Sequence, residues 1–193
     1  HYNKRNKLNL TNLLKSLKNQ NSDLLIVMND DDSSFEKNDI FQNVKTLIRP
    51  NTGMNIGSWN SSYFNNKNFD FYIFVQDECK ILNIDFVKKY VFELSKNDIG
   101  ITGESINYKW ANKWEDIANS SLNYIVGYNA LKKPVYRVQY YLSLMKKWGI
   151  EPGLTGLHLR SLVWGFKREV LEKLFPFPLG KTKEECIASE IAV

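Results

Sequence analysis

The stretch RPNTGMNIGSWNSSYFNNKNFDFYIFVQDECKI, residues 49–81, decides how the rest of the chain is interpreted. It begins with a Pro/Asn/Gly loop and continues through a short polar segment around residues 58–60. Aromatic and β-branched residues then follow one another over residues 69–75, which is typical of a strand. This strand stops at the residues Gln-Asp-Glu, 76–78. An apolar strand that ends in carboxylates places them at the carboxyl edge of a sheet, where open α/β folds bind ligands.

Asp77 and Glu78 are candidates for binding a divalent cation at this edge. A nucleoside diphosphate is an anion, and Mg²⁺ or Mn²⁺ held by one or two carboxylates together with phosphate oxygens neutralises it. Adjacent strand residues point to opposite faces, so both carboxylates reach one ligand only where the strand breaks into a loop. The alternative is a solvated turn without a ligand.

Other motifs precede this one in a fixed order. The chain opens with Tyr2-Asn3, continues with a segment that contains Ser-Leu and a later Gln, and reaches an apolar run that ends at Asn29-Asp30. The loop 51–57 and the strand that ends at residues 76–78 follow. In this order the motifs resemble the family 2 glycosyltransferases with a GT-A fold, and the resemblance covers roughly the first half of the chain. Residues 76–78 depart from the Asp-x-Asp motif that is typical of that family.

The resemblance implies a nucleotide-binding site. Tyr2, Asn29 and Asp30 would bind the nucleoside, and the two carboxylates of residues 77–78 would hold Mn²⁺ or Mg²⁺ on the diphosphate. In the loop that follows, Gly53 would let the main chain approach the nucleotide, and a side-chain amide would hydrogen-bond to it, from either of two positions: Asn51 and Asn55. A plain turn is the alternative for this loop.

The resemblance also implies a fold: an α/β, GT-A-like domain with a mostly parallel sheet flanked by helices. A chain of 193 residues suits a single domain. We expect a nucleotide-binding half over about residues 1–82 and an acceptor-binding half over about residues 83–193. His1 stands where the first strand of that fold would already be ending, so we expect a fragment that lacks this strand.

Apolar spacing predicts the secondary structure. Helical periodicity is present in residues 8–17, 84–94 and 135–147, and a further helix is expected over 183–191. Apolar runs of strand length occur at 24–28, 44–48 and 161–166, and a strand that runs into a loop begins at 99.

The second half carries further candidates for binding. Glu104, Asn107, Trp110 and Trp114 could grip a sugar, although tryptophans four residues apart often pack in a core. The segment 149–156 contains one proline and three glycines and is a candidate lid. It is followed by His158, for which a structural role is the alternative, and by Arg160, whose guanidinium can bind two phosphate oxygens.

Two glutamates are candidates for the catalytic base. Inverting members of the family use a carboxylate near the start of a helix that follows a Phe-containing loop, and residues 175–180 resemble that loop. Glu185 fits by position, and Glu190 competes with it because its surroundings also resemble the family motif. The alternative is that first-turn glutamates complement the helix dipole.

Composition limits the class of protein. Hydrophobic residues make up 43% and charged residues 24%, which is ordinary for a soluble globular chain. The net charge of +5 and the pI near 9.0 favour anionic partners. Cys79 and Cys186 form no disulfide or metal pattern, and no secretory signal or apolar run of about 18 residues is present. We therefore expect a cytoplasmic enzyme whose basic surface can touch the inner face of a membrane.

The sequence thus favours a metal-dependent, inverting glycosyltransferase that moves a sugar from a nucleotide-diphosphate donor to a glycan or other hydroxyl acceptor. A catalytically inactive carbohydrate-binding homologue is one alternative, and the unusual Gln-Asp-Glu motif supports it. A nucleic-acid-binding module is a weaker one, because the lysines are scattered over helix faces and do not alternate with aromatic residues. No nucleic-acid partner is expected.

Overall fold

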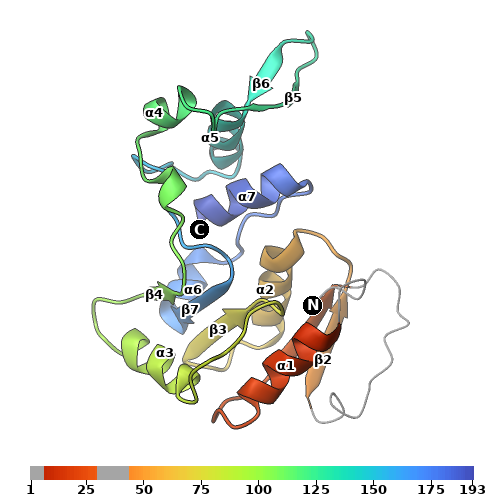
Figure 1. The fold of residues 1–193 in the computed structure, drawn as a ribbon, viewed down its shortest axis with the longest axis vertical. Helices are drawn as coiled ribbons and strands as arrows, with labels where there is room; N and C mark the ends of the chain where they lie inside the picture. Colours follow the sequence, from red (N-terminus) through yellow and green to blue (C-terminus); the bar gives the residue numbers. More distant parts are fainter. Residues whose placement is uncertain (1–6, 30–43) are drawn as a thin grey trace.

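The computed structural model describes residues 7–29 and 44–193. Figure 1 shows a lower part, which contains most of the strands, and an upper part, which is built from helices and one hairpin. Two predicted nucleoside-binding residues, Tyr2 and Asp30, lie outside the described residues. The structure therefore says nothing about the positions of these two residues.

The lower part contains two small sheets. Strands β1 (Leu25–Asn29) and β2 (Lys45–Arg49) form a parallel pair. Strand β7 (Val163–Lys167) lies between β3 (Phe71–Val75) and β4 (Ile101–Gly103) and is antiparallel to both. In the part of the chain that the structure describes, no ladder joins the first sheet to the second.

The prediction of a mostly parallel sheet is not confirmed. The expected strand at residues 161–166 does form as β7, but it runs against its neighbours. The chain reaches β7 only after an excursion through the upper part of the molecule and enters the sheet from the opposite end (Figure 1). An apolar run predicts that a strand exists, whereas its direction depends on such connections.

Helices cover the two sheets. As predicted, α1 (Lys7–Leu17) is amphipathic, with Leu10 and Leu14 packed against β1 and with Leu13 and Leu17 packed beside α3 (Phe86–Leu94). The helix α6 (Arg168–Leu174) follows β7 directly. Because α1 contacts β1 on one side and α3 on the other, it links the two sheets.

The helix α2 (Met54–Asn65) begins inside the predicted loop 51–57 and continues through the polar segment around residues 58–60. The Pro, Asn and Gly residues of the loop do not indicate a helix, and the Asn, Ser and Gly residues of α2 are poor helix formers. Ile56, Trp59 and Tyr63 are nevertheless spaced as on one helix face, and all three are buried. Tertiary packing of this apolar face therefore outweighs the weak helix propensity of the segment.

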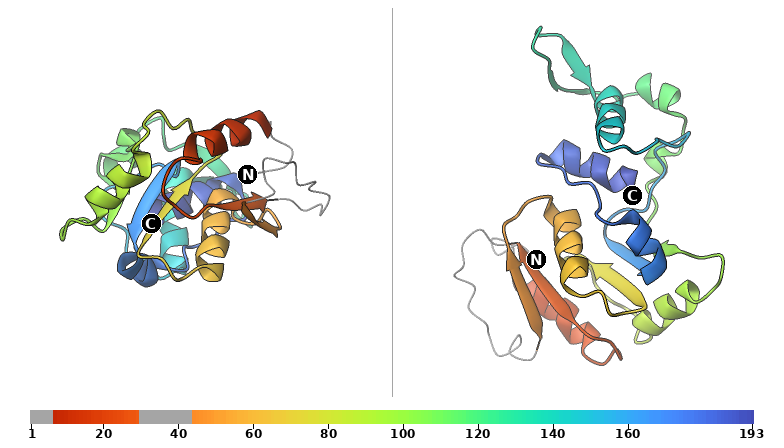
Figure 2. Two further views of the ribbon diagram at one scale, coloured as in Figure 1. Left: turned by 90° about the horizontal axis from the view of Figure 1, so that it is seen from below. Right: turned by 180° about the vertical axis from the view of Figure 1, so that it is seen from behind.

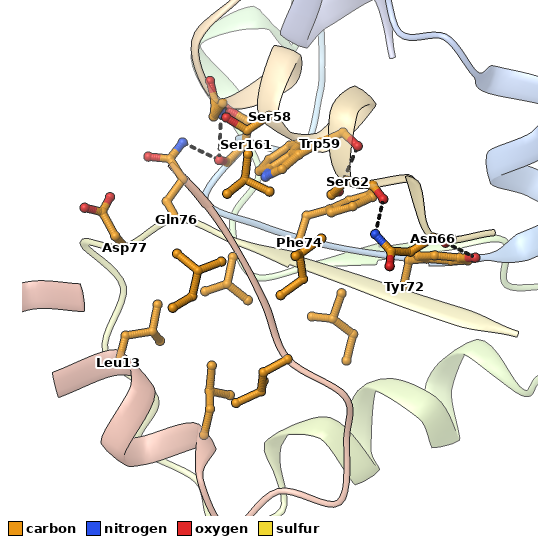
Figure 3. Close-up of a pocket in the computed structure, with 18 of the residues that line it drawn as sticks. Leu13, Ser58, Trp59, Ser62, Asn66, Tyr72, Phe74, Gln76, Asp77 and Ser161 are labelled. Atoms are coloured by element: carbon orange, nitrogen blue, oxygen red, sulfur yellow. Dashed lines mark hydrogen bonds between the residues drawn. The ribbon is translucent and has the colours of Figure 1, made fainter. Parts of the chain in front are cut away.

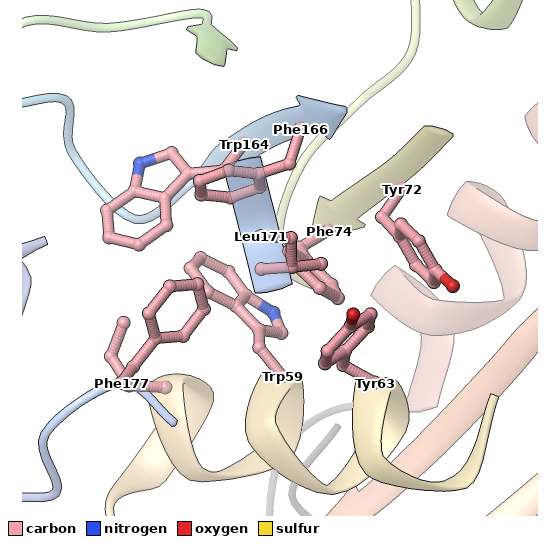
Figure 4. Packing of buried hydrophobic residues seen from close by; sticks show 9 residues of the cluster. Trp59, Tyr63, Tyr72, Phe74, Trp164, Phe166, Leu171 and Phe177 are labelled. Carbon is pink, nitrogen blue, oxygen red and sulfur yellow. The ribbon is translucent and has the colours of Figure 1, made fainter. Parts of the chain in front are cut away.

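Trp59 lies at the centre of the main aromatic core, shown in Figure 4. Its ring stacks on that of Phe74 with centroids 5.3 Å apart and contacts that of Trp164 at 4.8 Å. Phe166 and Phe177 extend this cluster. The core thus fastens α2 to β3 and β7 and fixes where the first turn of α2 lies.

The upper part of the molecule contains α4 (Trp114–Ala118), the hairpin β5 (Ile125–Tyr128) and β6 (Pro134–Tyr136), α5 (Arg137–Lys147) and α7 (Lys183–Ala192). A 3₁₀ turn over Tyr108–Trp110 precedes α4. Trp110 is buried against Tyr141, so it belongs to the core and offers no exposed face to a sugar. No helix among residues 7–29 and 44–193 is long and apolar enough to cross a membrane.

Candidate functional site

A cavity of about 1220 Å³ lies between β1 and β3. Much of it is lined by apolar side chains, including four leucines of α1. Figure 3 shows Ser58, Gln76 and Ser161 together on one side of the cavity, with Asp77 next to Gln76 on the side towards Leu13. The polar residues that line the cavity include Asn29, Asn51, Asn55, Ser58, Gln76, Asp77, Ser161, Lys183 and Glu190.

Ser161 brings three separate elements together at the polar side. Its hydroxyl accepts a hydrogen bond from Asn55 Nδ2 at 2.6 Å, and its carbonyl accepts one from Gln76 Nε2. Its backbone N–H donates to Glu190 Oε1. The first turn of α2, the end of β3 and the last turn of α7 therefore meet at one residue, which the sequence analysis did not identify as part of a site.

Asn29 fixes the neighbouring corner of the site. Its Oδ1 accepts from Arg49 Nη1 at 2.5 Å and from the hydroxyl of Ser58 at 2.8 Å, and its Nδ2 donates to the carbonyl of Met54 at 3.2 Å. The Arg49 guanidinium also donates to the carbonyl of Thr52 at 2.6 Å. The carboxyl ends of both parallel strands are thus tied to the beginning of α2. Asn29 was a candidate because it is a polar residue at the end of an apolar strand. The same argument applies to Arg49, which ends the parallel strand β2.

The N-terminus of α2 has the features of an anion-binding site. Its N-cap is Gly53, which has a positive φ of 73° and supplies no side-chain cap, and its first turn carries no acidic residue. The first N–H groups of a helix have no partner inside the helix, and the helix dipole places positive charge there. The Arg49 guanidinium lines neither cavity, but its hydrogen bonds to Asn29 and to the Thr52 carbonyl hold its positive charge beside this end of α2, which therefore suits a phosphate.

The predicted metal ligands are not placed alike. Asp77 lines the cavity and is half-buried, whereas Glu78 is exposed and is not among the lining residues. Within the described residues no group of three His, Cys, Asp or Glu side chains could hold a metal ion. A divalent cation at Asp77 would therefore take most of its ligands from phosphate oxygens and water, as Mg²⁺ commonly does.

Glu190 lies where the first cavity meets a second one of about 350 Å³. Trp114, Trp164 and His158 are among the residues that line the second cavity. His158 is buried, its Nδ1 lies 2.7 Å from the carbonyl of Gly156, and its Nε2 lies 4.0 Å from Glu190 Oε1. Glu190 therefore faces both cavities from the last turn of α7.

Burial lowers the pKa of His158, although the Gly156 carbonyl and Glu190 act in the opposite direction. The unfolded chain therefore takes up the proton at a higher pH than the folded chain does. We expect the contribution of His158 to the free energy of unfolding to be constant above about pH 7.5 and to fall as the pH drops through the ordinary histidine pKa towards the folded one. In His158→Gln this fall should be smaller, as urea denaturation at pH 7.5, 6.5 and 5.5 would measure.

The other histidine of the chain, His1, is present in both proteins, so any effect of its protonation is the same in the two denaturation series. The pKa values of Glu184 and Glu185 are lowered from 4.5, so their contribution is lost only at more acidic pH. An equal loss of stability in wild type and in His158→Gln would contradict the assignment.

Glu185 has a structural role at the other end of α7. Its side chain accepts from the backbone N–H groups of Lys181 and Thr182 and from the hydroxyl of Tyr140, and the Thr182 hydroxyl accepts from the Glu185 N–H. These contacts form a capping box. The Lys181 amide, helped by the Tyr140 hydroxyl, lowers the pKa of Glu185. Glu185 lines neither cavity.

The remaining predicted residues fall into two groups. Asn51 and Asn55 line the first cavity, and Gly53 begins α2 beside it. Arg160 is exposed, lines neither cavity, and donates its backbone N–H to the carbonyl of Ser105 at 2.8 Å. Of the predicted residues that the structure describes, Asn29, Asn51, Asn55 and Asp77 thus line one cavity, whereas Glu78 and Arg160 do not.

No protein-family model matches this chain, and no curated protein matches it. One similar solved structure is that of a CMP:2-keto-3-deoxy-manno-octonic acid synthetase complexed with CTP. The match covers 94% of this chain and 71% of that chain, with 13% sequence identity and a TM-score of 0.46. A likeness this weak assigns neither an activity nor a ligand to the chain.

Proposed function

We propose that this protein binds a nucleoside-diphosphate sugar at the polar side of the first cavity and transfers the sugar to a hydroxyl acceptor in the second cavity. The position of Glu190, which lines both cavities, is the observation that supports this proposal most strongly. A general base must lie within hydrogen-bond reach of the hydroxyl that it deprotonates. A carboxylate that lines both cavities can reach a hydroxyl of an acceptor in the second cavity while that hydroxyl attacks a donor in the first.

The diphosphate would lie at the N-terminus of α2. The helix end and the Arg49 guanidinium supply positive charge there, and the corner around Asn29 holds both in place. Asp77 would hold Mn²⁺ or Mg²⁺, which neutralises negative charge on the phosphate oxygens. The part of the cavity that is lined by apolar side chains, including the leucines of α1, has no role in binding the phosphates.

The transfer itself is a displacement at the anomeric carbon of the sugar. The acceptor hydroxyl gives its proton to Glu190, and its oxygen forms a bond to the anomeric carbon. The bond between that carbon and the phosphate oxygen breaks, and the nucleoside diphosphate leaves with the electron pair. Attack from the side opposite the leaving group inverts the configuration. The helix N-terminus and Arg49 stabilise the charge that develops on the leaving group.

A carbohydrate-binding protein without transfer activity is the second candidate. It is favoured by the placement of Glu78 outside the cavity, which leaves Asp77 as the one carboxylate of the predicted pair that lines it. Such a protein would bind glycans without consuming a nucleotide sugar.

Calorimetric titration of UDP, GDP and dTDP, with and without Mn²⁺, tests the proposal. We expect one nucleotide to bind in a metal-dependent manner, and Asp77→Asn to weaken this binding about tenfold, because one charge-assisted ligand is lost. Asp98→Asn is the matched control, since Asp98 is exposed and lines neither cavity. If none of the nucleotides binds to the wild type, the proposal is wrong, and the second candidate gains support.

A further inference from the structure

The hairpin of β5 and β6 projects from the upper part of the molecule in Figure 1 and in the right-hand view of Figure 2. Its apolar side chains do not join a core: Leu131 is 76% exposed and Tyr128 is 69% exposed. Ile125 and Tyr136 face each other across the ladder and are also exposed. Single exposed apolar residues are normal, but a group of them on one projecting hairpin indicates an interaction surface.

The tip of this hairpin is held in one shape. Asn129 Oδ1 accepts from the backbone N–H groups of Leu131 and Lys133, both at 3.0 Å. The N–H of Lys132 donates to the carbonyl of Asn129 at 2.9 Å, and Lys132 adopts a left-handed conformation with a φ of 58°. Because the turn is already ordered, Leu131 can enter a partner without a large loss of conformational entropy.

The charge around the tip has one sign. Residues 117–150 contain no Asp or Glu, and their five basic residues are Lys132, Lys133, Arg137, Lys146 and Lys147. Arg137, at the base of the hairpin, pairs with Glu184 at 3.2 Å. The exposed Lys132 and Lys133 therefore make the tip positively charged, and this charge favours an anionic partner.

From these three observations we infer that the hairpin tip docks on a bilayer surface that contains anionic lipids. Tyr128 lies at the headgroup level, Leu131 reaches the boundary with the acyl chains, and the two lysines contact lipid phosphates. A single-stranded nucleic acid would also attract the lysines, but it stacks on aromatic faces, whereas the most exposed apolar side chain of the hairpin is a leucine. This inference does not depend on the nucleotide site.

Sedimentation with lipid vesicles tests the inference. The probes are vesicles of phosphatidylcholine alone and of phosphatidylcholine with about one third phosphatidylglycerol. The wild type should bind the anionic vesicles preferentially. Lys132→Gln/Lys133→Gln should bind them about 25-fold more weakly, since each lysine near an anionic surface contributes about fivefold. Leu131→Ser should bind the anionic vesicles about tenfold more weakly, because the variant has no apolar side chain at this position to transfer from water into the bilayer.

Matched controls come from the lower part of the molecule. Lys88→Gln/Lys89→Gln removes the same charge from exposed positions of α3, and Leu82→Ser changes a leucine that is 84% exposed. Both control proteins should bind as the wild type does. The inference is overturned if the anionic vesicles are not preferred or if the controls lose as much binding as the tip variants. It is also overturned if the wild type does not bind vesicles but binds a single-stranded oligonucleotide, and the tip variants bind that oligonucleotide more weakly. The partner would then be a nucleic acid.

Discussion

Replacing Glu190 with glutamine is expected to lower the rate of sugar transfer by about 10² to 10⁴, which is the usual contribution of a general base. Glutamine keeps the shape of the side chain and an oxygen that can accept from the Ser161 N–H, so the contact between α7 and the loop before β7 survives. It cannot take a proton from a hydroxyl group. The affinity for the nucleotide should therefore change little, and the loss should appear in kcat.

Glu185→Gln is the matched control for this prediction. Glu185 sits on the same helix, but its carboxylate is engaged in the capping box and lines neither cavity. Weakening this cap should cost about 1 kcal/mol of stability and leave the transfer rate nearly unchanged. The proposed role of Glu190 is refuted if the two variants lose activity to the same extent, or if the loss in Glu190→Gln is accompanied by an equal loss of nucleotide affinity.

Secondary structure could be predicted well where the apolar pattern was strong. The helices at α1, α3, α5 and α7 and the strands β1, β2, β3 and β7 all occur within a few residues of their predicted places. The helix α2 was not predicted, because the Pro, Asn and Gly residues of 50–57 indicated a loop, although Ile56, Trp59 and Tyr63 have helical spacing. For a segment rich in Asn, Ser and Gly, the apolar spacing was the better signal.

The candidate site was harder to predict, because its residues meet only in the folded chain. Asn29 and Asp77 could be found, since a polar residue at the end of a buried strand is a local feature of the sequence. Ser161 could not, because its importance lies in contacts with Asn55, Gln76 and Glu190, which come from three other elements. The choice between Glu185 and Glu190 likewise depends on which way each side chain faces along α7.

Gly57→Ala is expected to lower the free energy of unfolding by about 3 kcal/mol, at the upper end of what overpacking costs. A Cβ atom at this position would lie 1.9 Å from the carbonyl oxygen of Thr52 and 2.8 Å from Arg49 Nη2. Neither contact is possible, so the turn before α2 must move. Urea denaturation would measure the loss. Gly127→Ala is the control, because nothing lies within 4 Å of a Cβ atom built there.

The same substitution also tests whether the site and the core are coupled. Thr52 and Arg49 are joined by the hydrogen bond that holds the guanidinium at the N-terminus of α2, so moving Thr52 displaces the charge proposed to face the diphosphate. In Gly57→Ala, nucleotide affinity should therefore fall by at least tenfold at temperatures where the protein is still folded, because a charge-assisted contact is lost. A destabilised protein with unchanged affinity would show that Arg49 acts only in the fold. In that case the helix N-terminus alone would have to carry the phosphate site.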